Sequence, residues 1–287
     1  MLAETQYVRP ETPAEASDFL AHNQNALVLA GGTDVLVGIE GGKLSPSVLV
    51  DIGGLEELKG IREEAGRVWI GALTFMSALR RSELVHDYFP ALVTAASSMG
   101  CWQVQNRATL GGNLCNASPS ADTAPPLLVY GAVAVCSDGE SERRIPVESF
   151  LAGPGKTDLL LGELLLGVEI EKPAPDVASA YARRSLRRSM DIPVVNVAVS
   201  GRFDDVGMAD PRVALGAVGP VPFRAVDAEQ QLAGSDLNDE VITRAAEAAA
   251  QSACPITDIR STVRYRTEMV KVLVRRTLVE LREEVGT

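Results

Sequence analysis

The segment from Thr109 to Pro126 holds residues whose types are suited to binding a ligand. Gly111 and Gly112 have no Cβ, so a ligand could approach their main-chain N–H groups closely, and positive φ angles are available without strain. Short polar side chains such as Asn113 follow, and these can contact a ligand or brace a turn. The segment is therefore predicted to be a binding loop, and a flexible connector is the alternative.

A second glycine segment precedes it in the chain. The apolar run at residues 27–30 is typical of a buried parallel strand, and Gly31-Gly32-Thr33-Asp34 follows it directly. A strand, a glycine turn, and then a hydroxyl and an acid at a helix start together aim main-chain amides at phosphate oxygens. The spacing matches neither Gly-x-Gly-x-x-Gly nor the phosphate-binding loop with its lysine, so a different dinucleotide fold is implied.

Capping and periodicity predict the elements that position these segments. Thr12-Pro13-Ala14-Glu15 is a capping box with proline at the first helical position, so a helix should begin there. Asp122 precedes an apolar run and is expected to cap another helix. Strands are expected at residues 26–30, 47–52, 59–63, 67–71, 132–137, 143–147, 159–170, 194–203 and 212–218, and helices at 35–40, 74–81, 89–99, 238–252 and 263–284. The strands at 59–63 and 67–71, and those at 132–137 and 143–147, are predicted to form two hairpins, because short loops with glycine join them.

Residues 171–176 are the best linker candidate, because two prolines and several charges interrupt both periodicities there. Strands followed by helices after this point indicate an α+β C-terminal domain. We therefore expect a first subdomain at residues 1–55 with a strand–helix–strand unit, a second subdomain at 56–172, and the C-terminal domain at 177–287.

Charge and composition exclude several classes of function. The 38 acidic residues outnumber the 27 basic ones and give a formal net charge of -11, which disfavours nucleic acid or an anionic membrane as a partner. Residues 1–10 lack the features of a signal peptide, and no stretch approaches the ~20 apolar residues of a membrane span, so a cytoplasmic protein without a transmembrane segment is expected.

The cysteines and histidines predict no metal site on this chain. The 4 cysteines show no Cys-x-x-Cys spacing, and there are only 2 histidines, so neither zinc nor an iron–sulfur cluster is expected here. Cys115 lies inside the glycine segment, where simple packing is favoured over a redox role.

Four stretches, in this order along the chain, carry a resemblance to a known family. They are Leu29-Ala-Gly-Gly-Thr-Asp-Val-Leu36, Ile70-Gly-Ala-Leu-Thr74, Ala108-Thr-Leu-Gly-Gly-Asn-Leu114 with Ala117-Ser-Pro-Ser-Ala-Asp122, and Arg187-Arg-Ser-Met-Asp-Ile192. Together they resemble the FAD-binding medium subunits of molybdenum hydroxylases, which include the flavoprotein subunits of xanthine, aerobic carbon monoxide and nicotine dehydrogenases. The resemblance covers nearly the whole chain.

The resemblance implies both a fold and a function. The expected fold class is α+β, with a two-lobed FAD-binding fold of the vanillyl-alcohol-oxidase (PCMH) type and a C-terminal domain of the carbon monoxide dehydrogenase flavoprotein type. The chain would be an oxidoreductase subunit that carries FAD and passes electrons from a small [2Fe-2S] subunit to an external acceptor. A large subunit with the molybdopterin cofactor would oxidise the substrate, and the complex is expected to be a dimer of heterotrimers.

Two alternatives remain open at this point. A self-contained flavin oxidase or dehydrogenase of the same fold would need its own acid–base residues, and the few histidines and the lack of paired catalytic carboxylates argue against it. A flavin-free assembly subunit would not need the two intact glycine segments. No catalytic residue is predicted on this chain.

The resemblance also implies which residues contact FAD. Amides of Ala30 to Asp34 would hold one side of the pyrophosphate, and the segment beginning at Thr109 would hold the other. Asp122 would accept a hydrogen bond from a ribityl or neighbouring hydroxyl, and Tyr181 would pack on the isoalloxazine or serve as a core tyrosine. The full set is Leu29, Ala30, Gly31, Gly32, Thr33, Asp34, Val35, Leu36, Gly100, Thr109, Leu110, Gly111, Gly112, Asn113, Asp122, Leu165, Tyr181 and Arg183.

Two departures from the family pattern are visible. Members often have Ile-Arg-Asn-x-Gly before the second glycine segment, where this chain has Val104-Gln-Asn-Arg-Ala108. Arg183 stands where a lysine is often found, which keeps the charge but changes the donor geometry. Leu165 matches a family position that touches the flavin, although most of its strand is expected to be core.

Overall fold

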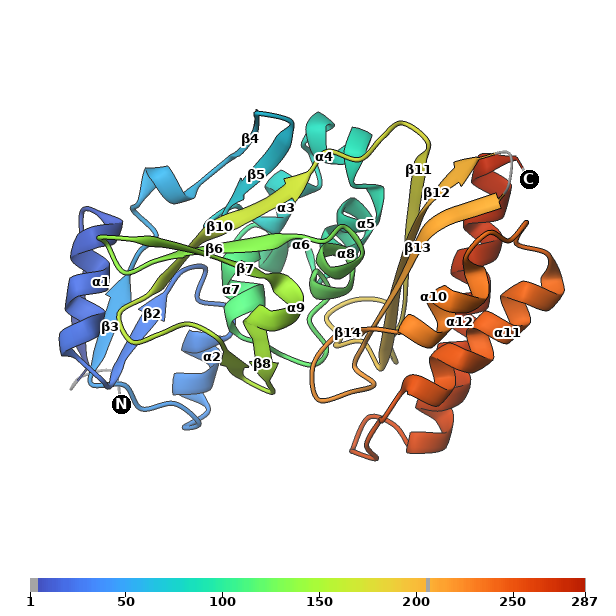
Figure 1. Cartoon of the computed structure of the whole chain (residues 1–287). Helices are drawn as coiled ribbons and strands as arrows, with labels where there is room; N and C mark the ends of the chain where they lie inside the picture. The colour runs from blue at the N-terminus through green and yellow to red at the C-terminus, as the bar shows by residue number, and fades with distance from the viewer. Residues whose placement is uncertain (1–4, 205–206, 287) are drawn as a thin grey trace.

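The structure is a computed structural model that describes residues 5–204 and 207–286. Within these residues the chain forms sheets of three, five and four strands and a small two-stranded sheet. Figure 1 shows the three larger sheets following one another from the N-terminal to the C-terminal end of the molecule. The mixture of helices and strands confirms the predicted α+β class. Residues 1–4, part of the stretch in which we expect no targeting signal, lie outside the described residues.

The first sheet is parallel, and its strands have the order β1-β3-β2. The N-terminal elements are β1 (Gln6–Val8), α1 (Pro13–His22), β2 (Ala26–Leu29), α2 (Val35–Glu40) and β3 (Val48–Asp51). Helix α1 is capped as predicted, because the Thr12 hydroxyl accepts from the amide of Glu15 at 3.1 Å. The strand–helix–strand unit is confirmed, but β1 was not predicted, since three largely exposed residues carry no periodic signal.

The second sheet is antiparallel, with the order β4-β5-β10-β6-β7. Both predicted hairpins are confirmed as β4–β5 and β6–β7. Alternate residues of β5, β6 and β10 are buried in one core with the short helices that follow β5. The strands are β4 (Ile61–Glu64), β5 (Arg67–Gly71), β6 (Val133–Ser137), β7 (Glu142–Pro146) and β10 (Leu164–Glu171).

Short helices occupy most of the chain between β5 and β6, where the sequence predicted two helices, a binding loop and a further helix capped by Asp122. They are α3 (Met76–Leu79), α4 (Glu83–Tyr88), α5 (Pro90–Ser98), α6 (Trp102–Gln105), α7 (Leu110–Cys115) and α8 (Ala124–Val129). A short 3-10 helix, η2 (Glu56–Leu58), precedes β4, and α9 (Val147–Phe150), β8 (Leu151–Gly153) and β9 (Lys156–Thr157) lie between β7 and β10.

The C-terminal part begins with a four-stranded antiparallel sheet and ends in helices, as predicted. Its elements are β11 (Val177–Arg184), β12 (Val195–Asp204), β13 (Gly207–Gly216), β14 (Phe223–Arg224), α10 (Val226–Leu232), α11 (Asp239–Ser252) and α12 (Val263–Val285). Strand β11 was not predicted, because its many alanines and its two arginines do not resemble a typical strand.

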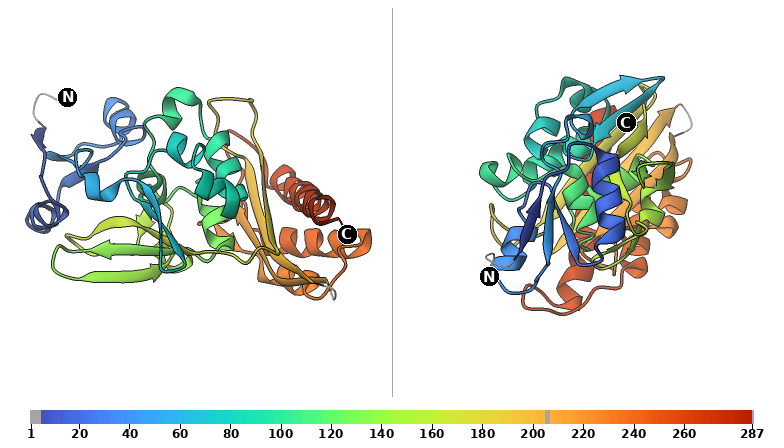
Figure 2. Two further views of the ribbon diagram at one scale, coloured as in Figure 1. Left: turned by 90° about the horizontal axis from the view of Figure 1, so that it is seen from above. Right: turned by 90° about the vertical axis from the view of Figure 1, so that its left-hand side faces the viewer.

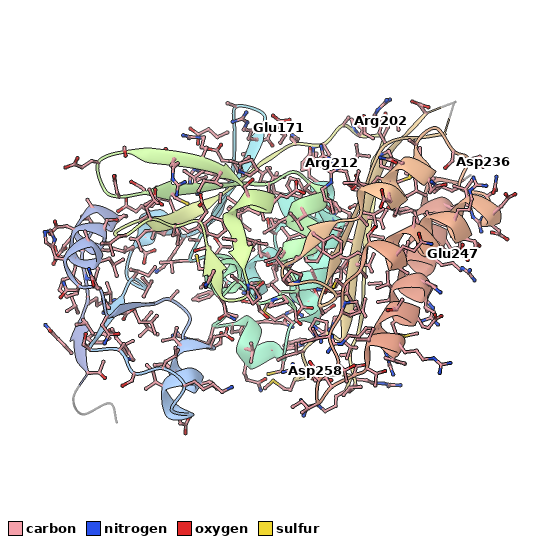
Figure 3. All side chains as sticks on the ribbon, turned by 60° about the horizontal axis from the view of Figure 1, so that its bottom comes forward. Glu171, Arg202, Arg212, Asp236, Glu247 and Asp258 are labelled. Atoms are coloured by element: carbon pink, nitrogen blue, oxygen red, sulfur yellow. The ribbon has the colours of Figure 1, made fainter. Side chains whose placement is uncertain are left out.

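This C-terminal sheet is buried on both faces (Figure 2, left). Val197 and Val199 of β12 pack in the core formed with α10, α11 and α12, whereas Ala198 lies in the other core with α5 and α8. The alternation follows from the two-residue period of a strand. Figure 3 shows side chains filling the interface between the C-terminal sheet and the short helices after β5. At this interface Arg212 donates from Nη1 to the carbonyl of Val129 at 3.3 Å. The C-terminal sheet therefore forms part of the core that the second sheet shares with the short helices after β5.

The small side chain of Ala198 should be required at this interface. We expect Ala198→Leu to lower the free energy of unfolding by about 1–3 kcal/mol, because extra methylenes in a close-packed core force displacements. Ala152→Leu, at an exposed position of β8, is the matched control and should change stability by less than about 0.5 kcal/mol. Thermal or denaturant unfolding measures both, and equal stabilities would show that the interface is loosely packed.

Candidate cofactor-binding site

The first glycine segment connects the C-terminal end of β2 to the start of α2. Gly32 has a φ of 78°, a conformation that side chains other than glycine rarely adopt. The amides of residues 31–34 donate to no acceptor in the described part of the chain. Asp34 is the N-cap residue of α2, but its side chain makes no capping hydrogen bond. The segment therefore presents several free main-chain donors, as the sequence predicted.

The second glycine segment begins with a helix, which corrects the prediction of a loop. Thr109 is the N-cap of α7, and its Oγ1 accepts from the amide of Gly112 at 3.0 Å. The amide of Leu110 donates to the carbonyl of Thr74 at 2.9 Å, and that of Gly111 donates to the carbonyl of Ala72 at 2.8 Å. A short helix forms here because its first turn is held by the chain that follows β5.

These bonds also correct the role predicted for the amides of this segment. Gly111, Gly112 and Asn113 already have acceptors for their N–H groups within the chain, so these amides are not free to hold a pyrophosphate in this conformation. Neither glycine has a positive φ. Gly111 is required for packing, since a Cβ there would lie 2.6 Å from the Cβ of Ala72. Contact of these residues with FAD stays a prediction, and atoms other than their amide groups would have to make it.

The two glycine segments lie against each other. A Cβ on Gly31 would lie 1.9 Å from the carbonyl oxygen of Arg107, so only glycine permits this approach. Asn116, just after α7, donates from Nδ2 to Oδ1 of Asp34 at 3.4 Å. Burial raises the pKa of Asp34, and a hydrogen bond from Thr33 opposes this shift. The structure therefore brings the free amides of the first segment next to the start and end of α7.

Asp122 forms a buried cluster with Arg183 and Tyr181, and it does not cap a helix. The N-cap of α8 is Thr123, which makes no side-chain capping bond, so the predicted role of Asp122 as a cap is wrong. Oδ1 of Asp122 accepts from the Tyr181 hydroxyl at 2.7 Å and from Nη1 of Arg183 at 2.8 Å. Burial raises the pKa of Asp122, while the charge of Arg183 and both hydrogen bonds lower it.

Arg183 connects three parts of the chain. Besides Asp122, it donates from Nη1 to the carbonyl of Ser98 at 2.9 Å and from Nη2 to the carbonyl of Asp191 at 2.7 Å. Its side chain is only 11% exposed, so it is not part of a solvated charge run. Arg187, by contrast, is 69% exposed. Arg183 is therefore a buried partner of Asp122, whereas Arg187 lies on the surface.

The remaining predicted residues lie in two settings. Gly100 has a φ of 49°, and its carbonyl accepts from the amide of Met190 at 2.9 Å and from the hydroxyl of Ser189 at 3.1 Å. Leu165 is 4% exposed in β10, which agrees with the expected core strand. Tyr181 is also 4% exposed, so its ring offers little surface to an isoalloxazine, and the alternative of a core tyrosine holds.

Other sites in the described residues do not compete with this one. No group of three or more histidine, cysteine, aspartate or glutamate side chains could hold a metal ion there. Burial raises the pKa of Cys115 to about 12, which keeps the thiol protonated and unreactive at neutral pH. A hollow of about 710 Å³ lies on the other face of the five-stranded sheet, around Trp69, and no predicted FAD residue lines it.

No described helix has the length and apolar character needed to cross a membrane.

The donor set fits a dinucleotide cofactor with a diphosphate and several hydroxyls. Free amides at a helix start stabilise phosphate charge without a lysine. Oδ2 of Asp122 accepts no hydrogen bond from the described residues and is not sealed in the interior, so it could accept one from a hydroxyl. The fold and this site together define a protein that binds a dinucleotide cofactor.

Comparison with known families identifies the family to which this chain belongs. Residues 3–173 match the family described as the FAD binding domain in molybdopterin dehydrogenase, and residues 180–281 match the carbon monoxide dehydrogenase flavoprotein C-terminal domain. The chain therefore belongs to the FAD-binding subunits of the molybdenum-dependent dehydrogenases. This confirms the predicted family, its cofactor FAD and its oxidoreductase class.

Relatives match over nearly their whole length. The chain is 34% identical over 276 residues to the xanthine dehydrogenase FAD-binding subunit of Escherichia coli O157:H7, covering 96% of this chain and 94% of that one. It is 32% identical over 278 residues to the glyceraldehyde dehydrogenase medium chain of Sulfolobus acidocaldarius, with 97% and 98% covered. A chain of the carbon monoxide dehydrogenase from Hydrogenophaga pseudoflava superposes with a TM-score of 0.94 at 29% identity, with 98% of both chains covered.

Sequence reasoning missed two features of the site. The carbonyl of Arg107, against which Gly31 packs, gives no signal in the sequence because any residue has a carbonyl. Asn196, which donates from Nδ2 to the Tyr181 hydroxyl at 3.3 Å, was treated as part of an apolar strand. A lone amide within the run Val194-Val-Asn-Val-Ala198 could have indicated a buried polar contact.

The free amides after β2 predict a specific effect of Gly32→Ala. The atoms nearest to its added Cβ would be in the side chains of Leu36, at 3.0 Å, and Leu29, at 3.3 Å. Alanine at a φ of 78° costs about 1–2 kcal/mol and should turn the amides away. We expect FAD affinity, measured by titrating the flavin-free chain, to fall about tenfold.

Gly66→Ala is the matched control for this substitution. Gly66 has a φ of 79° in the β4–β5 hairpin, and nothing lies within 4 Å of its added Cβ. The two variants should lose similar stability, but only Gly32→Ala should lose FAD affinity. Equal FAD affinity in both would mean that the amides of residues 31–34 do not bind the cofactor.

The buried ion pair predicts a pH-dependent effect of Arg183→Gln. Removing the cation leaves Asp122 buried without its charge partner, which should cost about 3 kcal/mol of unfolding free energy at neutral pH. The pKa of Asp122 should rise further, so its protonation relieves the variant first as the pH falls. The difference in unfolding free energy between the variant and the parent protein should therefore be largest at neutral pH. It should become smaller as the pH falls towards 3.8, the ordinary pKa of an aspartate side chain. A difference independent of pH would contradict the charge pairing.

Proposed function

We propose that this chain is the FAD-carrying electron-transfer subunit of a molybdenum hydroxylase complex. A small [2Fe-2S] subunit would supply electrons to it, a large subunit with the molybdopterin cofactor would oxidise the substrate, and an external acceptor would take the electrons from FAD. Family membership supports this proposal, as do relatives that are themselves FAD-binding subunits or medium chains of dehydrogenases.

The observation that carries the proposal is the set of free amides at residues 31–34 beside α7. These amides would bind the diphosphate, and the cluster of Asp122 with Arg183 would present a carboxylate oxygen to a hydroxyl of the cofactor. When bound, FAD supplies a carrier that exchanges electrons singly or in pairs, and the chain supplies its position and electrostatic environment. The chain itself needs no general base, which agrees with the absence of a predicted catalytic residue.

We also propose that FAD lies between the lobes of residues 1–55 and 56–172, next to a C-terminal domain at 177–287. The close contact of Gly31 with Arg107 and the bond of Asn116 to Asp34 join the two lobes where the free amides lie. We further propose that the chain assembles with both partner subunits as a dimer of heterotrimers in the cytoplasm. Relatives that are FAD-binding subunits or medium chains of dehydrogenases support the partnership.

The proposal predicts a yellow protein without hydroxylase activity of its own. The purified full chain should show a flavin spectrum that is released as FAD on denaturation, and it should oxidise no purine, aldehyde or N-heterocycle without partners. Purification from the native host under mild conditions should recover an iron–sulfur subunit and a molybdenum subunit with it. A colourless chain that takes up no added FAD would contradict the proposal, and so would full hydroxylase activity from the chain alone.

A further inference from the structure

A row of buried hydrogen bonds leads from the C-terminal sheet to Asp122. Asn196 of β12 is 0% exposed and donates from Nδ2 to the Tyr181 hydroxyl at 3.3 Å and to the carbonyl of Ala121 at 3.2 Å. The Tyr181 hydroxyl donates in turn to Oδ1 of Asp122. The register explains this grouping, because Arg183 of β11 pairs directly with Asn196, and Tyr181 lies on the same face two residues earlier.

Asn196 stays buried although its side chain is only half satisfied. Its Oδ1 has no hydrogen-bond partner and packs against Gly216, where a Cβ would lie 2.1 Å away. A buried acceptor without a partner costs free energy, which an apolar side chain at this position would not. Asn196 therefore makes two hydrogen bonds through Nδ2 but leaves its Oδ1 without a partner. This indicates that the two donated bonds have a role.

The hydrogen bonds donated by Asn196 affect which oxygen of Asp122 remains available as an acceptor. Arg183 and Tyr181 both bind Oδ1, and Oδ2 accepts nothing from the described residues. Without the Tyr181 bond, the carboxylate could rotate, and Oδ2 could turn towards Arg183. Asn196 holds the Tyr181 hydroxyl from the other side, so its oxygen accepts from Asn196 while its hydrogen points to Asp122.

We propose that Tyr181 and Asn196 are positioning residues for FAD, which hold Oδ1 of Asp122 so that Oδ2 faces a hydroxyl of the cofactor. This inference rests on the proposed function, since it requires FAD to bind at Asp122. It makes flavin affinity depend on the C-terminal sheet, whose Tyr181 ring is buried and offers the cofactor little surface.

Electrostatics supports the same arrangement. Burial raises the pKa of Asp122, and the Tyr181 hydroxyl is one of the groups that lower it, together with the charge and hydrogen bond of Arg183. Burial also holds the pKa of Tyr181 well above its usual range, so the hydroxyl remains a neutral donor at physiological pH. Loss of this donor should therefore raise the pKa of Asp122 further.

Tyr181→Phe tests the proposal, with Tyr130→Phe as the matched control. Tyr130 is a partly buried tyrosine at this interface. Its hydroxyl accepts from the amide of Ala91 at 3.1 Å and bonds to Oγ of Ser179 at 2.5 Å, but it does not contact Asp122. We expect Tyr181→Phe to raise the Kd for FAD of the flavin-free full chain at least fivefold. Tyr130→Phe should change it less than twofold at a similar loss of thermal stability.

Two further measurements separate positioning from a general structural effect. In Tyr181→Phe, the decline of FAD affinity on acidification should begin at a higher pH than in the parent protein, because the pKa of Asp122 is raised. Asn196→Ala should weaken FAD binding, and the double variant with Tyr181→Phe should bind no more weakly than Tyr181→Phe alone, since Asn196 acts through Tyr181. If Tyr181→Phe does not fold, Asn196→Ala is compared with Ser200→Ala, which removes a buried bond to the carbonyl of Val129 at the same interface.

Asp122→Asn distinguishes failure of this inference from failure of the proposed function. If Asp122→Asn weakens FAD binding but Tyr181→Phe behaves like Tyr130→Phe, the positioning role is overturned while the cofactor site stands. Unchanged FAD binding in Asp122→Asn overturns the positioning role together with the placement of FAD at Asp122. If the parent chain takes up no FAD at all, the proposed function itself fails.

Discussion

A close approach of two backbones, at Gly31 and Arg107, is the constraint on which the cofactor site depends. The space between them excludes even a methyl group, so the turn after β2 rests directly on the chain that leads into α7. This contact joins the first lobe to the second and determines where the free amides of residues 31–34 lie. A second close contact, of Gly111 with Ala72, holds α7 on the chain after β5. Gly31 and Gly111 therefore permit the close contacts that join the turn after β2, α7 and the chain after β5.

The other half of the site depends on a sheet that is buried on both faces. Small residues such as Ala198 allow β12 to pack closely against α8, and the same face of the sheet carries Tyr181 and Arg183 to Asp122. An isolated carboxylate would be costly at this depth, and the guanidinium of Arg183 offsets that cost. Under the proposed function, the chain would act by position and charge, and its specificity for FAD would lie in which donors are free and which are occupied.

Local signals in the sequence were sufficient for much of the fold. The capping box at Thr12, the hairpins β4–β5 and β6–β7, and the long helices α11 and α12 were all predicted, because each depends on neighbouring residues. The segment after Thr109 was predicted as a loop because glycine disfavours helices. It forms α7 instead, since the carbonyls of Ala72 and Thr74 bind its first amides. Strand β11 was missed because its alanines and arginines are not typical of a strand.

The sequence by itself determined the two glycine segments, the predicted cofactor class and the order of the domains, because glycine, capping residues and periodicity act on their own neighbourhood. Only the tertiary structure decided which amides are free and which oxygen of Asp122 is available. Asp122 is separated from Tyr181 by 59 residues and from Arg183 by 61, and no local pattern specifies that pairing. A donor that bonds to an acceptor within the chain is no longer free to bind a ligand, however distant that acceptor is in the sequence. The donors that remain free are therefore determined only when the sheets pack together.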